Sequence, residues 1–373
     1  MKRYLYQQIK EDLKQKMVFV GGPRQVGKTT LSLDILQTNN INHPAYFNWD
    51  YPGIKNKILN AEFPANEKLL IFDEIHKYKH WRNLIKGIFD VHKYEKQFLI
   101  TGSAQLDYYR RGGDSLQGRY HYLRLHPFSL GEVKDSNIDT LLEFGGFPEP
   151  FLSGNKTFWK RWQTERIKRV VYEDLISLEK VNEISLMELM LENLPLRVGS
   201  PLSYQSIAQD LQVAPATVKN WIEIFERLYQ VFRISPFGSP KIRAIKKEQK
   251  LYFWDWSLIE DKGIKFENMV ASQLLKFCHF KEDTEGVKME LRFLRDRESR
   301  EVDFVVIMDK KPLFAVEAKL SETTISPNIK YFAERTNIPI FYQVHIANAD
   351  YEVKELKTRV LPFAKFVSEL GLP

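Results

Sequence analysis

Short apolar runs alternate with amphipathic stretches along the first 150 residues. Residues 1–16 place apolar side chains at helical spacing, which predicts a lead-in helix. Helical patterns also begin at residue 28 and cover residues 81–92. Apolar runs that predict buried strands lie at residues 17–20, 44–50, 68–76 and 97–103. Strands that alternate with helices in this way predict a parallel sheet covered on both faces.

The middle of the chain is mainly helical. Residues 156–194 carry apolar positions between lysines and arginines, which indicates a long helix with a basic face, or a connecting helix whose charged face is simply solvated. Residues 203–211 and 215–228 predict two helices joined by a tight turn. The β-rich stretches that follow them complete the pattern of a winged helix-turn-helix; they lie at residues 229–235 and 250–256.

The last third of the chain changes character again at residue 263. An amphipathic helix over residues 264–275 is followed by strands, a helix and a last strand. The strands are predicted at residues 290–295, 301–308 and 313–319, the helix at 327–336 and the last strand at 339–344. This third of the chain is therefore also α/β.

Length and composition allow several globular domains. The chain has 373 residues, enough for two or three domains, and 43% of them are apolar. The formal net charge is +7, but 55 basic against 48 acidic residues make this weak evidence for nucleic acid. The basic excess is concentrated at residues 156–169 and 241–250.

Cysteine usage and hydropathy indicate which cellular compartment to expect. The single cysteine, Cys278, excludes an internal disulfide and a cysteine-based zinc site, as is typical of a reducing compartment. No apolar run approaches the roughly 18 residues that span a bilayer. We therefore expect a cytoplasmic protein without a membrane partner.

The strongest chemical motif follows the first predicted strand. Residues 22–29, GPRQVGKT, fit G-x-x-x-x-G-K-[ST] at every fixed position. Such a loop curls its backbone N–H groups around a phosphate, and the dipole of the following helix favours the same anion. Lys28 is expected to reach the β- and γ-phosphates of ATP, and the Thr29 hydroxyl to ligate Mg²⁺. The residues expected to bind the nucleotide are Gly22, Pro23, Arg24, Gln25, Val26, Gly27, Lys28, Thr29 and Thr30.

Polar residues at the ends of two further strands complete the predicted nucleotide site. Asp73 is expected to hold Mg²⁺ through water, and Glu74 to orient and polarise the attacking water. Ser103 is the predicted sensor of the γ-phosphate. All of these residues follow strands at the carboxyl edge of the sheet, where α/β proteins bind ligands.

Two other polar residues of this region are ambiguous. Arg119 precedes a predicted strand and could project toward the γ-phosphate of a neighbouring subunit, although an ordinary surface arginine is an equal alternative. His76 is interpreted as a helix or surface histidine rather than a catalyst.

The helix-turn-helix also has two readings. If it reads DNA, the residues near the start of its second helix are the expected contacts, namely Thr217, Lys219 and Asn220. The alternative is that this fold serves as a lid or as a contact between subunits.

The last third carries a pattern typical of metal-dependent nucleases. Glu317 and Lys319 share one face of a strand, and Asp303 is expected to face them from the adjoining hairpin strand. Two carboxylates can bind a second divalent metal, Mg²⁺ or Mn²⁺, and a lysine can position an attacking water. Glu267, on the preceding helix, is a further expected metal ligand. Charged pairs of this spacing are also frequent on exposed strand faces.

Taken together, the motifs resemble a large prokaryotic group of AAA-type ATPases. These proteins combine a P-loop core, a winged-helix region and a C-terminal domain with a PD-(D/E)xK restriction-endonuclease-like core. The stretches that carry the resemblance are GGPRQVGKTTL, LLIFDEIHK, LITGS, SLQGRYHYLRLHPFSL, GGFPEP, FENMVASQLL, EVDFVV and AVEAKL. One position departs from the pattern, because Val302 stands where a proline commonly precedes the metal-site aspartate.

The resemblance implies an α/β chain of three domains. An AAA-type ATPase domain is expected at residues 1–150, a helical and winged-helix domain at 151–262, and a nuclease-like domain at 263–373. It also implies the roles given above for Lys28, Thr29, Asp73, Glu74 and Ser103, and a homo-oligomer that could be a ring.

Two functional hypotheses follow from the sequence. The first is an ATPase that couples Mg-ATP hydrolysis to rearrangement of a bound nucleic acid, branched or damaged DNA among the candidates, with metal-dependent cleavage as a candidate second activity. The alternative is a nucleotide-dependent switch or scaffold that binds protein partners, with an inactive nuclease-like domain. A nuclease regulated by ATP is a third reading.

Overall fold

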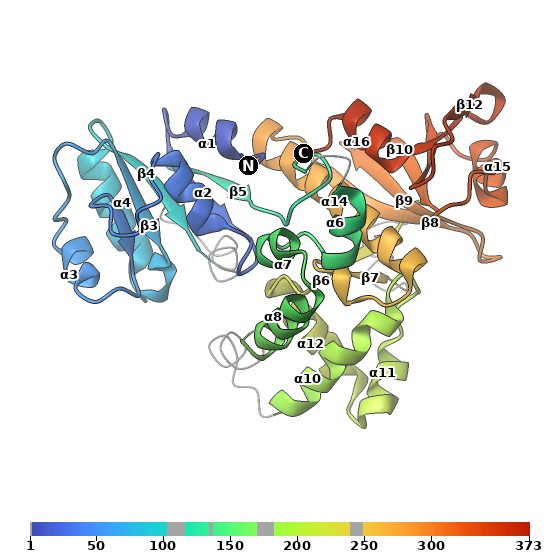
Figure 1. The fold of residues 1–373 in the computed structure, drawn as a ribbon, viewed down its shortest axis with the longest axis horizontal. Coiled ribbons are helices and arrows are strands. Elements are labelled where there is room, and N and C mark those ends of the chain that lie inside the picture. The colour runs from blue at the N-terminus through green and yellow to red at the C-terminus, as the bar shows by residue number, and fades with distance from the viewer. Residues whose placement is uncertain (1, 103–115, 134–136, 170–182, 239–248) are drawn as a thin grey trace. The chain divides into compact units, whose positions relative to one another are not determined.

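The chain folds into two compact units. The computed structural model describes residues 2–102, 116–133, 137–169, 183–238 and 249–373 (Figure 1). The first unit is Met1–His126 and the second is Pro127–Pro373. The first boundary therefore lies before the expected residue 150, and the second unit contains both the middle and the last third of the chain.

A five-stranded parallel sheet forms the centre of the first unit. The inner strands β1, β3 and β4 are largely buried apolar runs, as expected for strands covered on both faces, whereas the edge strand β5 is only partly buried. The spatial order is β2-β3-β4-β1-β5, so β4 lies between the strand that precedes the phosphate loop and the strand that ends at Asp73. The strands are β1 (Met17–Gly21), β2 (Tyr46–Asn48), β3 (Leu69–Asp73), β4 (Gln97–Thr101) and β5 (Tyr120–Arg124).

Helices pack on this sheet as the alternating pattern predicts. Phe19 of β1 lies in one apolar cluster with Trp81 and Ile85 of α4 (Trp81–His92). The helix α1 (Tyr6–Asp12) contacts β1, and the helix α2 (Lys28–Ile35) contacts β4 (Figure 1). A further helix, α3 (Ile54–Leu59), contacts β2. The expected lead-in helix is therefore present.

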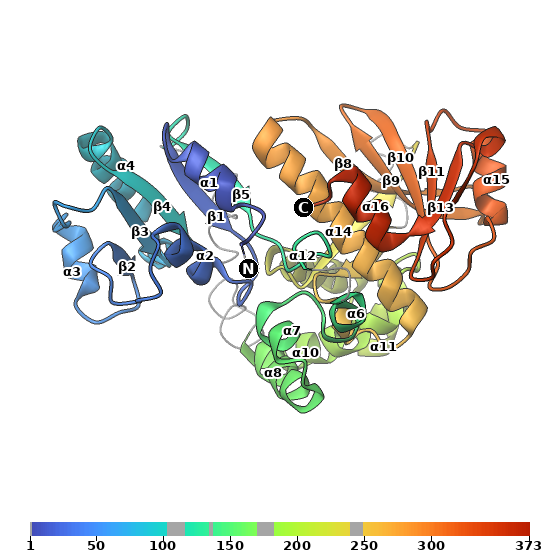
Figure 2. The same ribbon diagram turned by 45° about the horizontal axis from the view of Figure 1, so that its top comes forward.

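An eight-stranded mixed sheet organises the second unit (Figure 2). Its order is β12-β13-β11-β10-β9-β8-β6-β7. The strands are β6 (Val231–Pro236), β7 (Lys250–Phe253), β8 (Met289–Arg295), β9 (Glu301–Met308), β10 (Lys311–Ala318), β11 (Phe341–His345), β12 (Tyr351–Val353) and β13 (Thr358–Pro362). Because β6 pairs with β8, the hairpin after the helix-turn-helix belongs to the same sheet as the last third, and the expected boundary at residue 262 does not separate two sheets.

Helices cover this second sheet from both faces. Phe314 of β10 contacts Phe277 of one helix and Phe366 of another, whereas Val305 of β9 clusters with Phe332. Alternate residues of adjacent strands thus face different helices, as strand geometry requires. The helices of the unit are α6 (Ile138–Phe144), α7 (Pro148–Ser153), α8 (Lys156–Arg169), α10 (Ile184–Asn193), α11 (Tyr204–Leu211), α12 (Pro215–Arg227), α14 (Lys262–Glu285), α15 (Pro327–Ala333) and α16 (Phe363–Leu370). Of the helices that the structure describes, none is long and apolar enough to cross a membrane.

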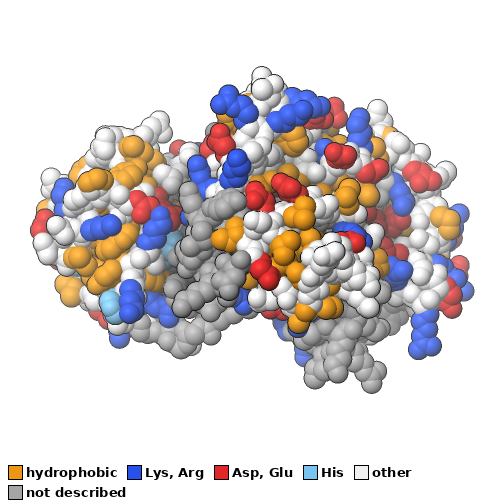
Figure 3. Space-filling model, turned by 90° about the horizontal axis from the view of Figure 1, so that it is seen from below, with side chains coloured by type: hydrophobic (Ala, Val, Ile, Leu, Met, Phe, Trp, Pro, Cys, Tyr) orange, Lys and Arg blue, Asp and Glu red, His pale blue; other side chains and the backbone are white. Residues whose placement is uncertain are grey.

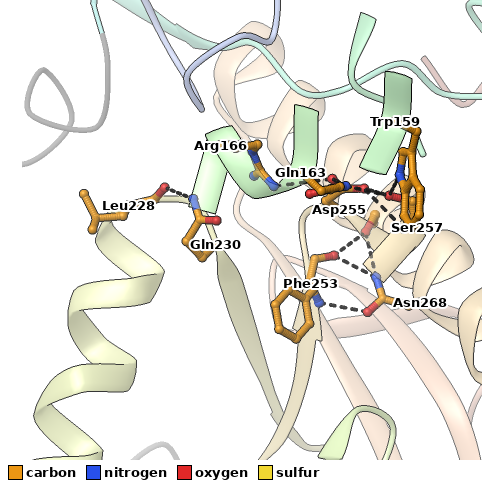
Figure 4. Close-up of polar contacts among 10 residues, drawn as sticks. Trp159, Gln163, Arg166, Leu228, Gln230, Phe253, Asp255, Ser257 and Asn268 are labelled. Atoms are coloured by element: carbon orange, nitrogen blue, oxygen red, sulfur yellow. Dashed lines mark hydrogen bonds and ion pairs between the residues drawn. The ribbon is translucent and has the colours of Figure 1, made fainter. Parts of the chain in front are cut away.

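A buried polar network ties α8 to the segment after β7. Figure 4 shows Gln163 and Arg166 of α8 directed at Asp255. The Gln163 amide donates to Asp255 Oδ2 at 2.6 Å, and the Arg166 guanidinium lies 3.3 Å from the same oxygen. Trp159 Nε1 donates to Ser257 Oγ at 2.9 Å. The inner face of this basic helix is therefore structural, and the cation of Arg166 is not available to an external anion.

Removal of the Arg166 charge is expected to destabilise the second unit. In Arg166→Met the buried Asp255 carboxylate would lose its cation, and breaking a buried pair from one side costs about 3 kcal/mol or more. Urea titration of the full chain measures this loss. The matched control is Arg161→Met, because Arg161 is an exposed arginine of the same helix and should change stability by less than about 0.5 kcal/mol. Equal losses in the two variants would contradict the assignment.

Candidate nucleotide site

Two glycines shape the loop between β1 and α2. Gly22 has φ +145° and Gly27 has φ +94°, backbone conformations that residues with a Cβ rarely adopt. A Cβ on Gly22 would lie 2.3 Å from the carbonyl oxygen of Leu125. The close approach of Leu125, the residue after β5, thus requires glycine at the first position of the motif, and the left-handed turn favours it at the second.

Lys28 begins α2 and turns back over the loop. The residue is only 7% exposed, and its ammonium donates to the carbonyl oxygens of Gly22 at 3.0 Å and Pro23 at 2.6 Å. The side chain therefore lies along the concave side of the loop rather than in solvent. An ammonium held there is placed to meet phosphate oxygens that the loop N–H groups bind.

Asp73 brings together three strands and the start of α2. Its Oδ2 atom accepts hydrogen bonds from the Thr29 hydroxyl at 2.9 Å and from the Tyr46 hydroxyl at 2.6 Å. Its Oδ1 atom accepts from the Thr101 hydroxyl at 2.5 Å. The structure thus places the predicted Mg²⁺ ligands, Thr29 and Asp73, side by side.

The same geometry fits Mg²⁺. A threonine hydroxyl and a nearby carboxylate are the protein ligands that P-loop proteins use for this ion. Asp73 is only 3% exposed, and three hydroxyl groups fix its two oxygens. The carboxylate therefore needs little rearrangement to serve as a ligand.

Sequence reasoning missed two of these partners. Thr101 ends β4 next to Asp73, as the strand register shows, and Tyr46 lies in β2, on the other side of β3. Their hydroxyls were visible in predicted strands, but only the strand order reveals that both strands flank Asp73. The pKa of Tyr46 is raised by burial and by the neighbouring carboxylate, so its hydroxyl keeps the proton that it donates.

Glu74 turns away from the strand axis and is partly buried. Its φ is +57°, and its N–H donates to the Thr101 carbonyl at 3.0 Å. Burial, and then the charge of Asp73, raise the pKa of the Glu74 carboxyl. A raised pKa makes a carboxylate a better proton acceptor, as activation of water requires.

His76 is a buried residue, which corrects the surface interpretation. It is 4% exposed in a short 3₁₀ helix, and its Nε2 atom lies 3.6 Å from Glu74 Oε2. Burial, then the charges of Lys77 and Lys28, lower the pKa of His76 to about 3. The imidazole is therefore neutral at physiological pH and packs behind Glu74.

Neutral burial of His76 predicts an acid-dependent loss of stability. The unfolded chain takes up a proton near pH 6.5 and the folded chain only near pH 3, so folding is disfavoured progressively as pH falls between these values, by up to about 1.4 kcal/mol per pH unit. Urea unfolding at pH 7 and pH 5 should show a smaller pH effect in His76→Gln than in the unsubstituted chain. Exposed His80 provides the control, and His80→Gln should keep the full pH effect.

Of the remaining predicted residues of this region, the structure describes Arg119 but not Ser103. Ser103 lies outside the described residues. Arg119 forms a forked ion pair with Asp90 of α4, with N···O distances of 2.9 and 3.1 Å. It precedes β5, at the amino edge of the sheet, whereas the phosphate loop follows the carboxyl end of β1. A role of Arg119 at a neighbouring subunit stays a prediction.

Two helices in contact, α11 and α12, occupy the region of the predicted helix-turn-helix. The Ser203 side chain caps α11, as its position predicts, and Pro215 begins α12. Near the start of α12, Lys219 and Asn220 are exposed and Thr217 is half-buried. The antiparallel strands β6 and β7 follow. The arrangement leaves the expected DNA-contacting residues accessible, and their use remains a prediction.

One lysine of the basic stretches is buried, although most cations of residues 156–169 are exposed. Lys250, counted in the stretch 241–250, is 1% exposed, and residues 241–248 lie outside the described residues. On the face drawn in Figure 3, Lys and Arg side chains lie among Asp and Glu side chains. Net charge is therefore a poor guide to a nucleic-acid surface on this face.

The acidic residues of the last third do converge. Glu317 Oε1 lies 3.0 Å from the Lys319 ammonium, and Asp303 Oδ2 accepts the backbone N–H of Ala318 at 2.9 Å. The charge of Asp303 also acts on Glu267. Burial, followed by the charge of Asp303, raises the pKa values of Glu267 and Glu317 to about 8.

The expected second metal site is not assembled. In the described parts of the chain, no group of three or more His, Cys, Asp and Glu side chains is arranged to hold a metal ion. One physical reason is that the buried ammonium of Lys250 lies 3.7 Å from the expected ligand Glu267. In the sequence, Lys250 ends a basic stretch and begins a β-rich one, and neither pattern indicates its ion pair with Glu267.

Three family models match consecutive parts of the chain. Residues 14–134 match an AAA domain. Residues 135–262 match a domain of unknown function, DUF8612, and residues 262–366 match another, DUF4143. The first unit is thus similar to AAA-type domains, in agreement with its phosphate loop and parallel sheet.

Individual relatives are distant. An uncharacterised protein of Methanocaldococcus jannaschii is 25% identical over 358 residues, covering 85% of this chain and 78% of the relative. An uncharacterised protein of Mycobacterium tuberculosis is 22% identical over 324 residues, covering 82% and 71% respectively. Among solved structures, the Thermotoga maritima RuvB Holliday junction branch migration motor gives a TM-score of 0.31 at 17% identity, covering 61% of this chain and 88% of RuvB. These similarities are too low to transfer a function.

Proposed function

We propose that the first unit binds Mg-ATP and hydrolyses it to ADP and phosphate. The observation that carries this proposal is the 2.9 Å contact between Thr29 of the phosphate loop and Asp73 of β3. It supports the proposal because it brings the phosphate-loop motif and a carboxylate at the end of β3 together at one edge of a parallel sheet, where α/β folds bind their ligands. The match of residues 14–134 to an AAA domain supports the same proposal.

Each residue has a distinct role in the proposed reaction. Lys28 stabilises negative charge on the β- and γ-phosphates, because its ammonium already lies over the loop. Thr29 and Asp73 hold Mg²⁺, which neutralises phosphate charge when it is bound. Glu74 orients the attacking water and accepts its proton. Tyr46 and Thr101 keep Asp73 in position through their hydroxyls.

We further propose that ATP turnover is coupled to nucleic acid, with DNA as the partner. The support is the exposed start of α12, the second helix of a helix-turn-helix, which carries Lys219 and Asn220. In this proposal the chain works as a homo-oligomer.

The DNA proposal is tested by gel shift and by ATP turnover at low salt. Single-stranded, duplex and junction DNA should each be tried, and at least one should bind and raise the rate. Lys219→Ala combined with Asn220→Ala should weaken binding and lower the salt dependence of log Kd by about one unit for the lost lysine. The control is Lys330→Ala, which removes an exposed lysine of α15. Absence of any shift with all three DNAs would overturn this part of the proposal.

One observation favours the alternative of a nucleotide-dependent switch with an inactive nuclease-like domain. The carboxylates of the second unit are paired with lysines rather than gathered as metal ligands. A switch of this kind predicts slow ATP turnover that DNA does not change, together with a nucleotide-dependent mass in light scattering. The turnover assay with DNA therefore separates the two functions.

A further inference from the structure

A buried lysine lies among the carboxylates of the second unit. Lys250 begins β7 and is only 1% exposed. Its ammonium forms a close ion pair with Glu301 of β9 and lies 3.7 Å from Glu267 of α14. Asp303, two residues after Glu301 on β9, adds a third negative charge that acts on it. This ammonium therefore faces acidic side chains from two neighbouring elements.

Other charged and polar groups form hydrogen bonds or ion pairs with the carboxylates near Lys250. Tyr252 donates its hydroxyl to Glu267 at 2.8 Å. Arg295 lies 3.5 Å from the second oxygen of Glu301, and Lys319 lies 3.0 Å from Glu317. Asp303 accepts the N–H of Ala318. Internal donors and cations thus reach Glu267, Glu301 and Asp303, whereas Glu317 Oε2 is buried and accepts no hydrogen bond from the described residues.

An ammonium and a divalent cation cannot both be accommodated among these carboxylates. A buried ammonium is tolerated only with close anionic partners, which Lys250 has. Mg²⁺ needs near-octahedral oxygen ligands at about 2 Å, so it would have to draw Glu267 and Glu301 away from the lysine. Moving Lys250 aside would leave its charge buried and unpaired, because β7 is covered by the sheet and α14.

We propose that Lys250 is the resident cation of this carboxylate cluster and that it excludes Mg²⁺ and Mn²⁺ from it. The cluster then serves to fix β7 against β9 and α14, and so joins the hairpin after the helix-turn-helix to the rest of the sheet.

Binding of Mn²⁺ tests this proposal directly. The full chain is used with Asp73→Asn, which removes the metal ligand of the nucleotide site, and free Mn²⁺ is measured by electron paramagnetic resonance without nucleotide. This protein should show no Mn²⁺ site tighter than about 1 mM. Adding Lys250→Met should create one site per chain at least tenfold tighter, and Mn²⁺ should then raise the Tm. Lys288→Met, at an exposed lysine, is the control and should create none.

The metal site gained should depend on the carboxylates. Asp303→Asn added to Lys250→Met should abolish it. The proposal is overturned if the chain that retains Lys250 already binds Mn²⁺ tightly and loses that binding with Asp303→Asn. It is also overturned if a folded Lys250→Met or Lys250→Gln variant gains no Mn²⁺ affinity. Should both substitutions prevent folding, the comparison of Asp303→Asn with the chain that retains Lys250 still decides.

Discussion

Replacing Lys28 with alanine is expected to lower ATP turnover by about 100- to 1,000-fold and to weaken ATP binding. The ammonium lies over the phosphate loop, at hydrogen-bond distance from two of its carbonyl oxygens, and no other lysine of the motif can replace it. Loss of one well-placed donor to a developing anion has an effect of this size. Phosphate release and binding of a fluorescent ATP analogue measure the two effects.

The control for this prediction is an exposed lysine of the same unit. Lys93→Ala should leave binding and turnover unchanged, because Lys93 follows α4 at the surface. If Lys28→Ala retains full turnover, the phosphate loop is not the site of hydrolysis, and the proposed function of the first unit is wrong.

Replacing Glu74 with glutamine is expected to separate binding from hydrolysis. The amide has nearly the shape of the carboxylate but cannot accept a proton, so turnover should fall by about 100- to 10,000-fold. ATP affinity should stay close to that of the unsubstituted chain, because Lys28, Thr29 and Asp73 are untouched. Pre-steady-state measurement of phosphate release, alongside equilibrium ATP binding, gives both quantities.

A matched control shows whether the effect is specific to Glu74. Glu95→Gln removes an exposed carboxylate of the same unit and should have no effect on turnover. A Glu74→Gln variant that hydrolyses ATP at the normal rate would show that another group activates the water.

The first unit could be predicted closely because its strands are buried on both faces. Such strands are continuous apolar runs, and each predicted run contains a strand of the observed sheet. Prediction was weaker at the end of the chain. The strand β12 has only three residues, two of them exposed, so its pattern does not stand out. The strand β12 was therefore missed, and the strand β13 and the helix α16 that follow it were not predicted either.

The candidate site shows where local pattern stops being informative. Lys28, Thr29, Asp73 and Glu74 belong to motifs whose spacing follows from the chemistry of phosphate and Mg²⁺, so sequence alone located them. The contacts of Tyr46 and Thr101 depend on which strands are neighbours of β3, and strand order cannot be read from periodicity.

The second unit also contains a contact that the local sequence pattern does not predict. Its motif predicts that Asp303 faces Glu317 and Lys319, and Asp303 accepts the N–H of Ala318, which lies between those two residues. Lys250 lies far from that motif in the sequence and reaches it only because β6 pairs with β8. A charged residue that begins an apolar run, as Lys250 does, is the one sequence signal that could have indicated a buried ion pair.

The most direct test of the account is the rate of phosphate release by the full chain with Mg-ATP. The account predicts turnover that requires Mg²⁺, falls in both Lys28→Ala and Glu74→Gln, and rises when DNA is added. Turnover that is absent in the unsubstituted chain, or equal in all three proteins, would contradict it.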